Sequence, residues 1–288
     1  MALTLTVLGS GGPIANPRRA SSGYLIAVDG SARILVDAGG GTYERLGRAG
    51  ADLRALELVL LTHTHIDHSG GLAPVVFDLY MNDRGRPLAV TGPAGREIHP
   101  GCGRFTELLF GRDGAWSYLH AFDGFGIAAR EVPSDPAGSE PHDVPLDDTG
   151  LAALGLRIRS VAVPHGMMPA VSYRIEHGGR SLTISGDVSE AAPGLIALAH
   201  ETDLLVHDLA LPERDLPHGD LHAKPSAVGR VAREAGARAL LATHFLPPIE
   251  PELDDALNIV RGLYAGPLYA AHDLAVFDID DEGVRESR

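Results

Sequence analysis

The densest group of chemically versatile side chains in this chain of 288 residues lies in the segment Thr62 to Gly71, which reads THTHIDHSGG. Its residues with metal-binding side chains are His63, His65, Asp67 and His68. Imidazole nitrogen and carboxylate oxygen suit zinc, and also manganese or iron, without any thiolate. The spacing therefore predicts a metal site, with room for two adjacent divalent ions.

This segment follows the apolar run Leu58-Val59-Leu60-Leu61, which is typical of a buried strand. In an extended chain His63 and His65 would point to the same side, because side chains alternate along a strand. A turn beginning near Ile66 would direct Asp67 and His68 toward a neighbouring point. The alternative is an accidentally histidine-rich loop without a metal.

Further metal-binding residue types follow other apolar runs. His165 follows Val161-Ala162-Val163-Pro164, Asp187 follows Leu182 to Gly186, and His244 follows Leu240 to Thr243. Taken singly, each would be an ordinary capped or partly buried residue. Together with the first motif they indicate one site that is assembled from the ends of several strands.

The composition narrows the class of protein and its partners. Lys and Arg number 24 against 38 Asp and Glu, a formal net charge of −14, and no large basic cluster is evident. Nucleic acid is therefore expected to be an unlikely partner, since its binding draws on clustered basic side chains. With Cys102 as the one cysteine, an internal disulfide is excluded and a cytoplasmic location is the simplest expectation. The beginning of the chain reads as a strand, so neither secretion nor a membrane span is expected.

Strand and helix patterns recur in a similar order in the two halves of the chain. Helices are expected at residues 42–49, 191–200, 225–235 and 252–264, each between runs typical of strands. Two facing sheets with helices outside would bury both the apolar strands and the apolar helix faces. The sequence therefore predicts an α/β fold, a four-layer αββα sandwich in a single domain over residues 1–288. The Gly-, Pro- and aromatic-rich stretch at about residues 100–150 is expected to form a cap or one wall of the pocket.

The ordered series of motifs resembles the metallo-β-lactamase-fold superfamily of metal-dependent hydrolases. The series comprises Gly9-Ser10-Gly11-Gly12, Asp37, the cluster from His63 to His68, His165, Asp187 and His244. Within that superfamily the chain looks most like the ribonuclease Z-like branch, which also contains phosphodiesterases and arylsulfatases. The resemblance implies that His63, His65 and His165 hold one zinc ion and that Asp67, His68 and His244 hold the second. It further implies that Asp187 bridges the two ions, while Asp37 supports a ligand histidine from behind.

One more histidine is singled out by the same resemblance. The segment Gly219 to Pro225 is similar to one in which a histidine precedes a helix and donates a proton to the leaving group. His222 is therefore expected to act as a general acid, and Asp67 is counted with it among the catalytic residues. A loop or helix-capping histidine is the alternative. His207 and Asp208 are expected to play at most a supporting part.

The predicted function is hydrolysis of a small phosphodiester or aryl sulfate ester by a hydroxide that bridges two metal ions. The alternatives are an endonuclease of the ribonuclease Z type, a lactone or β-lactam hydrolase, and a non-enzymatic metal-binding or redox scaffold. The stretch between His165 and Asp187 is too short for the tRNA-gripping arm of many ribonuclease Z enzymes, which favours a small-molecule substrate. The resemblance also implies a homodimer.

Overall fold

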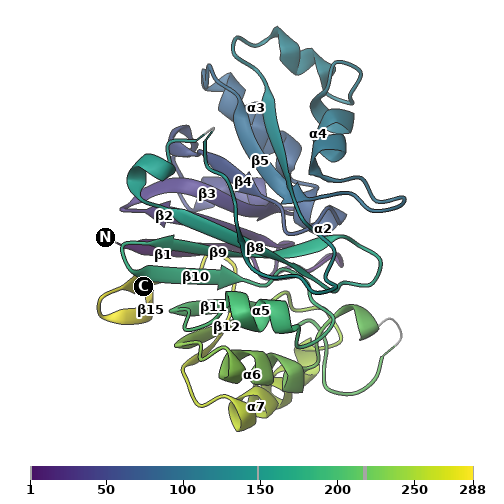
Figure 1. The fold of residues 1–288 in the computed structure, drawn as a ribbon, viewed down its shortest axis with the longest axis vertical. Coiled ribbons are helices and arrows are strands. Elements are labelled where there is room, and N and C mark those ends of the chain that lie inside the picture. The colour runs from purple at the N-terminus through teal and green to yellow at the C-terminus, as the bar shows by residue number, and fades with distance from the viewer. Residues whose placement is uncertain (1, 148, 217–218, 288) are drawn as a thin grey trace.

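The computed structural model of the chain describes residues 2–147, 149–216 and 219–287, and it contains two stacked sheets (Figure 1). The first sheet has eight strands in the order β15 (Gly283–Ser287), β14 (Val276–Asp280), β1 (Leu3–Gly9), β2 (Gly23–Val28), β3 (Ser31–Ala38), β4 (Leu58–Leu60), β5 (Leu88–Pro93) and β6 (Ile127–Val132). The second has seven in the order β13 (Leu268–Ala270), β12 (Ala239–Thr243), β11 (Leu204–Asp208), β10 (Arg180–Ile184), β9 (Ala170–His177), β8 (Arg157–Val163) and β7 (His142–Asp143).

Helices cover the outer faces of the two sheets. They are α1 (Thr42–Arg48), α2 (Ile66–Ser69), α3 (Leu72–Met81), α4 (Cys102–Phe110), α5 (Pro193–Leu198), α6 (Pro225–Glu234) and α7 (Leu253–Leu263). Figure 1 shows α3 and α4 on one side of the stacked sheets and α6 and α7 on the opposite side. The predicted αββα sandwich is therefore confirmed. Among the helices of the described ranges, none is long and apolar enough to cross a membrane.

Local sequence explains where these helices begin and end. Pro225 occupies the first turn of α6, where its missing N–H costs nothing, and Gly236 lies in the left-handed region just beyond its end, with φ of 64°. The helix expected at residues 191–200 is shorter in the structure, because Pro193 begins α5 and its last residue is Leu198. The apolar side of α6 is buried, with Val228 and Val231 fully covered.

The direction of the strands decides where their ends meet. Strands β3 and β4 are parallel neighbours, and β10, β11 and β12 are parallel neighbours in the other sheet. In parallel strands the carboxyl ends lie at one edge, which is where α/β sheets gather their ligands. The polar residues that follow these strands are therefore brought to a shared edge of the sandwich.

Residues 100–150, expected to be a cap or one wall of the pocket, contribute β6 and an outer layer to the first sheet and β7 to the second. Strand β6 is the edge strand beside β5, and α4 packs against both. Several aromatic side chains of the segment are used in this packing: Phe110 is buried, and Phe105, Trp116, Phe122 and Phe125 are partly buried against the same apolar cluster. Whether the segment also forms a wall of a substrate pocket stays a prediction.

The first prediction from the structure concerns the thiol of Cys102 at the start of α4. This side chain is fully buried, and burial raises its pKa to about 12. We expect the folded chain to react with a disulfide reagent at least ~100-fold more slowly than the unfolded chain, since the thiolate is both scarce and covered. Absorbance of the released thiol with and without denaturant measures this. Equal rates in the two states would contradict the buried position.

Candidate metal centre

The histidine-rich segment leaves strand β4 and enters the single-turn helix α2. His63 lies in the connection after β4, His65 is the residue that precedes the first turn of α2, and Asp67 and His68 lie within that turn. His63, Asp67 and His68 are buried, and His65 is half-buried. The predicted turn near Ile66 is the single-turn helix α2, which carries Asp67 and His68, whereas His63 and His65 precede it.

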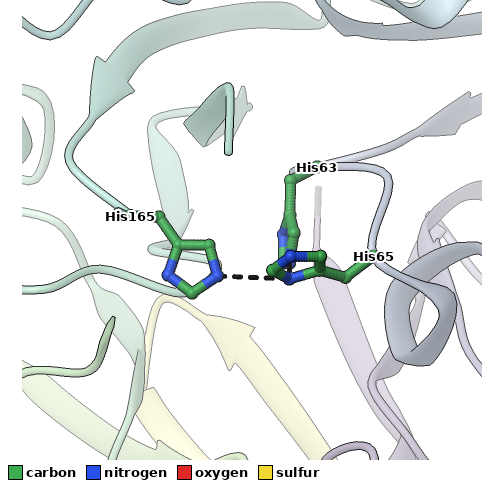
Figure 2. Close-up of side chains that lie close together, drawn as sticks. All are labelled: His63, His65 and His165. Carbon is green, nitrogen blue, oxygen red and sulfur yellow. Dashed lines mark hydrogen bonds between the residues drawn. The ribbon is translucent and has the colours of Figure 1, made fainter. Parts of the chain in front are cut away.

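His165 completes a group of three imidazoles with His63 and His65 (Figure 2). Nδ1 of His65 lies 3.0 Å from Nε2 of His63 and 3.3 Å from Nε2 of His165. Nδ1 of His165 lies 2.9 Å from the carbonyl oxygen of Leu221, so it donates there and leaves Nε2 unprotonated. Three ring nitrogens therefore converge on one point.

A second group lies beside the first and contains a carboxylate. Nε2 of His68 is 3.2 Å from Nε2 of His244, and Oδ2 of Asp67 is 3.3 Å from that nitrogen of His244. His244 follows β12 with a left-handed backbone, φ of 60°, which is uncommon for any residue but glycine. Such strained conformations are found where function requires a side chain to point in one direction.

Asp187 stands between the two groups and turns one oxygen toward each. Its Oδ2 lies 3.9 Å from Nε2 of His63 and 3.7 Å from Nε2 of His165. Its Oδ1 lies 3.3 Å from Nε2 of His68 and 3.4 Å from Nε2 of His244. Oδ1 is buried and has no hydrogen-bond partner among the described residues. The carboxylate is thus placed to contact two ions at once.

The donor set fits divalent metal ions. A buried carboxylate oxygen without a donor is costly unless a cation meets it, and the unprotonated ring nitrogens that converge beside it offer lone pairs to the same cation. Burial lowers the pKa of His63 well below its usual value and, with the nearby His165, lowers that of His65 to about 4. Neutral imidazoles with available lone pairs are the form that binds metal. His63 and His65 are therefore in the form that binds metal, and the histidines and aspartates of the two groups together offer a donor set for divalent metal.

Asp37 holds His68 from behind. The fully buried carboxylate lies at the end of β3, and its Oδ2 is 2.8 Å from Nδ1 of His68, while the same carboxylate accepts hydrogen bonds from the backbone N–H and the hydroxyl of Thr62. His68 therefore presents Nε2 to the site. The backbone at Gly39, just after β3, lies against the backbone of Asp67 in α2. Only glycine fits there, because a Cβ would lie 2.0 Å from the carbonyl oxygen of Asp67.

The second prediction is that Asp37→Ala weakens metal binding. Loss of a carboxylate that orients a ligand histidine typically costs 10- to 100-fold in metal affinity, so we expect about that loss for the ion held by His68. Competition with a chromophoric chelator measures it. The matched control is Asp52→Ala, which removes an exposed aspartate paired with Arg54 and should leave the affinity unchanged. An unchanged metal affinity in the Asp37 variant would show that this residue has no part in metal binding and serves only to form the turn.

His222 lies at the edge of the centre and is held by Asp208, for which at most a supporting part was predicted. Nδ1 of His222 is 3.1 Å from Oδ2 of Asp208 and 3.9 Å from Oδ2 of Asp187, and its side chain is 10% exposed. Burial opposes the protonated ring, but the hydrogen bond to Asp208 and the nearby carboxylates outweigh it, so the pKa of His222 is raised. The signal in the sequence was that Asp208, like Asp37, ends an apolar strand. His207, in contrast, is directed to the backbone oxygen of Asp208.

Comparisons with known proteins agree with this geometry. Residues 32–245 match the family model described as a beta-lactamase superfamily domain. The ribonuclease Z of Mycobacterium sp. (strain KMS) is 30% identical over 86% of this chain and 86% of its own length. Among solved structures, the metallo-beta-lactamase fold protein YhfI from Bacillus subtilis superposes with a TM-score of 0.74 at 20% identity, covering 96% of this chain and all of its own. The short form of human tRNase Z superposes with a TM-score of 0.70 at 21% identity, covering 95% and 98%.

The similarity to known proteins thus extends along most of the chain. Divalent metal binding is implied by that fold and matched by the donor groups described above. The chain therefore belongs to the beta-lactamase superfamily, in the ribonuclease Z-like branch of its metal-dependent hydrolases.

Proposed function

We propose that this protein is a dinuclear metal-dependent phosphodiesterase that acts on small phosphodiesters. The observation that carries the proposal is the position of Asp187, whose two oxygens face two separate groups of ligand atoms, with the His222 ring at their edge. A site for one ion would not require a carboxylate directed to both sides. Zinc is the proposed metal, because the donors are mainly imidazoles.

The residues of the chain supply position and proton transfer. When bound, two divalent ions lower the pKa of a water and stabilise the charge that develops on the attacked centre. Asp187 lies between the two ligand groups, and Asp67 belongs to the second of them. The protonated ring of His222 donates its Nε2 proton to the leaving oxygen, while Asp208 accepts the hydrogen bond from Nδ1 and holds the ring in that orientation. A carboxylate-oriented histidine is suited to such a step near neutral pH.

The size of the neighbouring cavity favours a small substrate. A cavity of about 500 Å³ opens beside His222, and Lys224, Arg230 and Arg214 are among the residues that line it. This volume lies in the range of ordinary small-molecule sites. Of these three cations, Lys224 and Arg214 are held by acidic partners, Asp215 and Glu252. Acidic side chains, among them Glu190 and Asp220, line the same cavity, and none of the seven residues of the two ligand groups does, so it is the volume alone that favours a small substrate.

An endonuclease of the ribonuclease Z type is the second candidate, and the relatives favour it. Their printed name, ribonuclease Z, makes the expectation that nucleic acid is an unlikely partner doubtful. Against it stands the hairpin between His165 and Asp187, in which β9 and β10 are joined by Gly178 and Gly179 alone, with no inserted arm. The net charge of −14 also disfavours a polyanion. Aryl sulfates remain within the proposal, since their leaving group needs the same proton.

A substrate panel tests the proposal. The metal-loaded protein is assayed with bis-nitrophenyl phosphate, nitrophenyl sulfate, a lactone, a β-lactam and a precursor tRNA. We expect the phosphodiester to be hydrolysed with the highest kcat/KM. Cleavage of the precursor tRNA at its 3′ side with a much higher kcat/KM would replace the proposal by the second candidate, and hydrolysis of the lactone or β-lactam alone would overturn both. Analytical ultracentrifugation of the same sample tests the homodimer that the resemblance implies.

A further inference from the structure

A cavity of about 530 Å³ lies at the end of the second sheet that is opposite the metal centre. Its lining includes the arginines Arg159 on β8, Arg174 on β9, Arg180 at the start of β10 and Arg238 just before β12. The run from Arg238 to His244 spans roughly 20 Å at about 3.3 Å per residue. The cavity is therefore distinct from the site of hydrolysis, and nothing proposed above uses it.

The first two arginines share one carboxylate. Arg159 and Arg174 are directly opposite each other on the antiparallel strands β8 and β9, an arrangement that is unfavourable for like charges. Oε1 of Glu176 accepts a hydrogen bond from Nε of Arg174 at 2.9 Å and lies 3.4 Å from Nη2 of Arg159. Arg174 is buried and also donates to the carbonyl oxygens of Leu198 and His200. Arg174 is thus fixed in the fold, whereas Arg159 is held weakly.

The other two arginines share a single oxygen. Oδ1 of Asp203 accepts from Nη1 of Arg238 at 3.0 Å and from Nη1 of Arg180 at 3.4 Å. Its other oxygen, Oδ2, is already used by the backbone N–H and the hydroxyl of Ser181. Arg180 has one further acidic neighbour, Asp281, at 3.5 Å, but the side chain of Asp281 is 92% exposed. Around the cavity, four guanidinium groups therefore depend on two buried or half-buried carboxylates.

Two N–H donors of the four arginines lack an acceptor in the described part of the chain. Nε of Arg159 and Nε of Arg180 are buried and have no hydrogen-bond partner among the residues that the structure describes. Leaving a buried charged donor unpaired costs free energy, so such groups call for an acceptor. The exposed Glu201 also lines the cavity, yet no contact of its carboxylate with these arginines is found in the described residues.

We propose that this arginine-lined cavity binds a phosphate group, either free or carried by a small metabolite. Guanidinium groups present several N–H donors in a planar fork that matches phosphate oxygens, and charge-assisted hydrogen bonds of this kind are the strong ones. A tetrahedral anion between Arg159, Arg180 and Arg238 would accept hydrogen bonds from their guanidinium groups, in a cavity lined by four arginines and three carboxylates. The site is a second anion site on a chain whose overall charge is −14.

Thermal unfolding of the metal-loaded chain tests this proposal. Inorganic phosphate and ribose 5-phosphate are each titrated to roughly 10 mM, which would saturate a site with a millimolar or lower Kd, with chloride at matched ionic strength as the reference. Arg159→Gln and Arg238→Gln are compared with Arg157→Gln, which lies on the same strand but is exposed and paired with Asp143 outside the cavity. We expect Arg159→Gln and Arg238→Gln each to raise the Kd by about tenfold or more, and Arg157→Gln to leave it unchanged.

The metal centre could also bind phosphate, and the variants separate the two sites. Only the part of the stabilisation that disappears in Arg159→Gln and Arg238→Gln and persists in Arg157→Gln belongs to the cavity. If inorganic phosphate and ribose 5-phosphate both stabilise the chain, the cavity recognises the phosphate group. If only ribose 5-phosphate does, the cavity also recognises the sugar that carries the phosphate. Either result supports the proposal. No stabilisation beyond that of chloride, or equal stabilisation of all four proteins, overturns it and leaves the arginines as a structural ion-pair cluster.

Discussion

Asp187→Ala is expected to lower the metal content of the purified protein from two ions per chain to one or none and to abolish hydrolysis. Each of its oxygens faces one of the two ligand groups, at 3.3–3.9 Å from their ring nitrogens. Removing a group that only orients a ligand already costs 10- to 100-fold, so we expect removal of the shared carboxylate to cost more than about 100-fold in metal affinity and in kcat/KM. Elemental analysis of dialysed protein and a phosphodiester assay measure both.

The control for this variant is Asp143→Ala. Asp143 is an exposed aspartate on β7 that pairs with Arg157, so its loss should change neither the metal content nor the turnover. Circular dichroism of both variants shows whether the fold is kept. Two tightly held ions and full activity in Asp187→Ala would refute the bridging position that is proposed for this carboxylate.

His222→Ala is expected to keep its metal ions and its fold but to lose turnover, by about 10²- to 10⁴-fold for substrates with poor leaving groups. The imidazole is held by Asp208 and also lies close to Asp187 and His244, so the retained metal content has to be measured together with turnover. A proton donor matters most when the leaving oxygen is basic. Turnover of a series of aryl phosphodiesters with leaving groups of increasing pKa therefore measures the effect. In a plot of the logarithm of turnover against leaving-group pKa, the slope should be steeper for the variant than for the parent.

Two companion variants sharpen this test. Asp208→Asn should reproduce part of the effect without loss of metal, because it removes the charge that orients and favours the protonated ring. His142→Ala is the matched control, since His142 contacts Ser160 on the neighbouring strand and lies outside both ligand groups. If parent and His222→Ala show the same slope and the same rate across the series, His222 has no part in proton transfer.

The strand-end pattern made much of the fold predictable. Apolar runs followed by His165, Asp187 and His244 indicated buried strands with polar ends, and parallel strands necessarily bring such ends to one edge. The division of the ligands into two groups came from family resemblance, because spacing alone does not tell which strand neighbours which. The structure brings the same residues together, and their roles as ligands stay a prediction.

Two features were beyond the reach of sequence patterns. A supporting part was predicted for Asp208, but its partner was not, because only the fold brings His222 to its carboxylate. The arginine-lined cavity depends on the pairing of β8 with β9 and on the starts of β10 and β12, whose arginines are far apart along the chain. A cap or pocket wall was predicted at about residues 100–150 because the segment is rich in Gly, Pro and aromatic residues; most of these aromatic side chains pack in the apolar cluster of the first sheet, and the cap stays a prediction.

The most direct test of the central claim is a titration of metal-free protein with zinc in which hydrolysis of bis-nitrophenyl phosphate is followed. If Asp187 joins two ions in one working centre, activity should rise until two equivalents per chain have been added and then stay constant, with two ions retained after dialysis. A plateau at one equivalent, or full zinc loading without hydrolysis of the phosphodiester, would contradict the account.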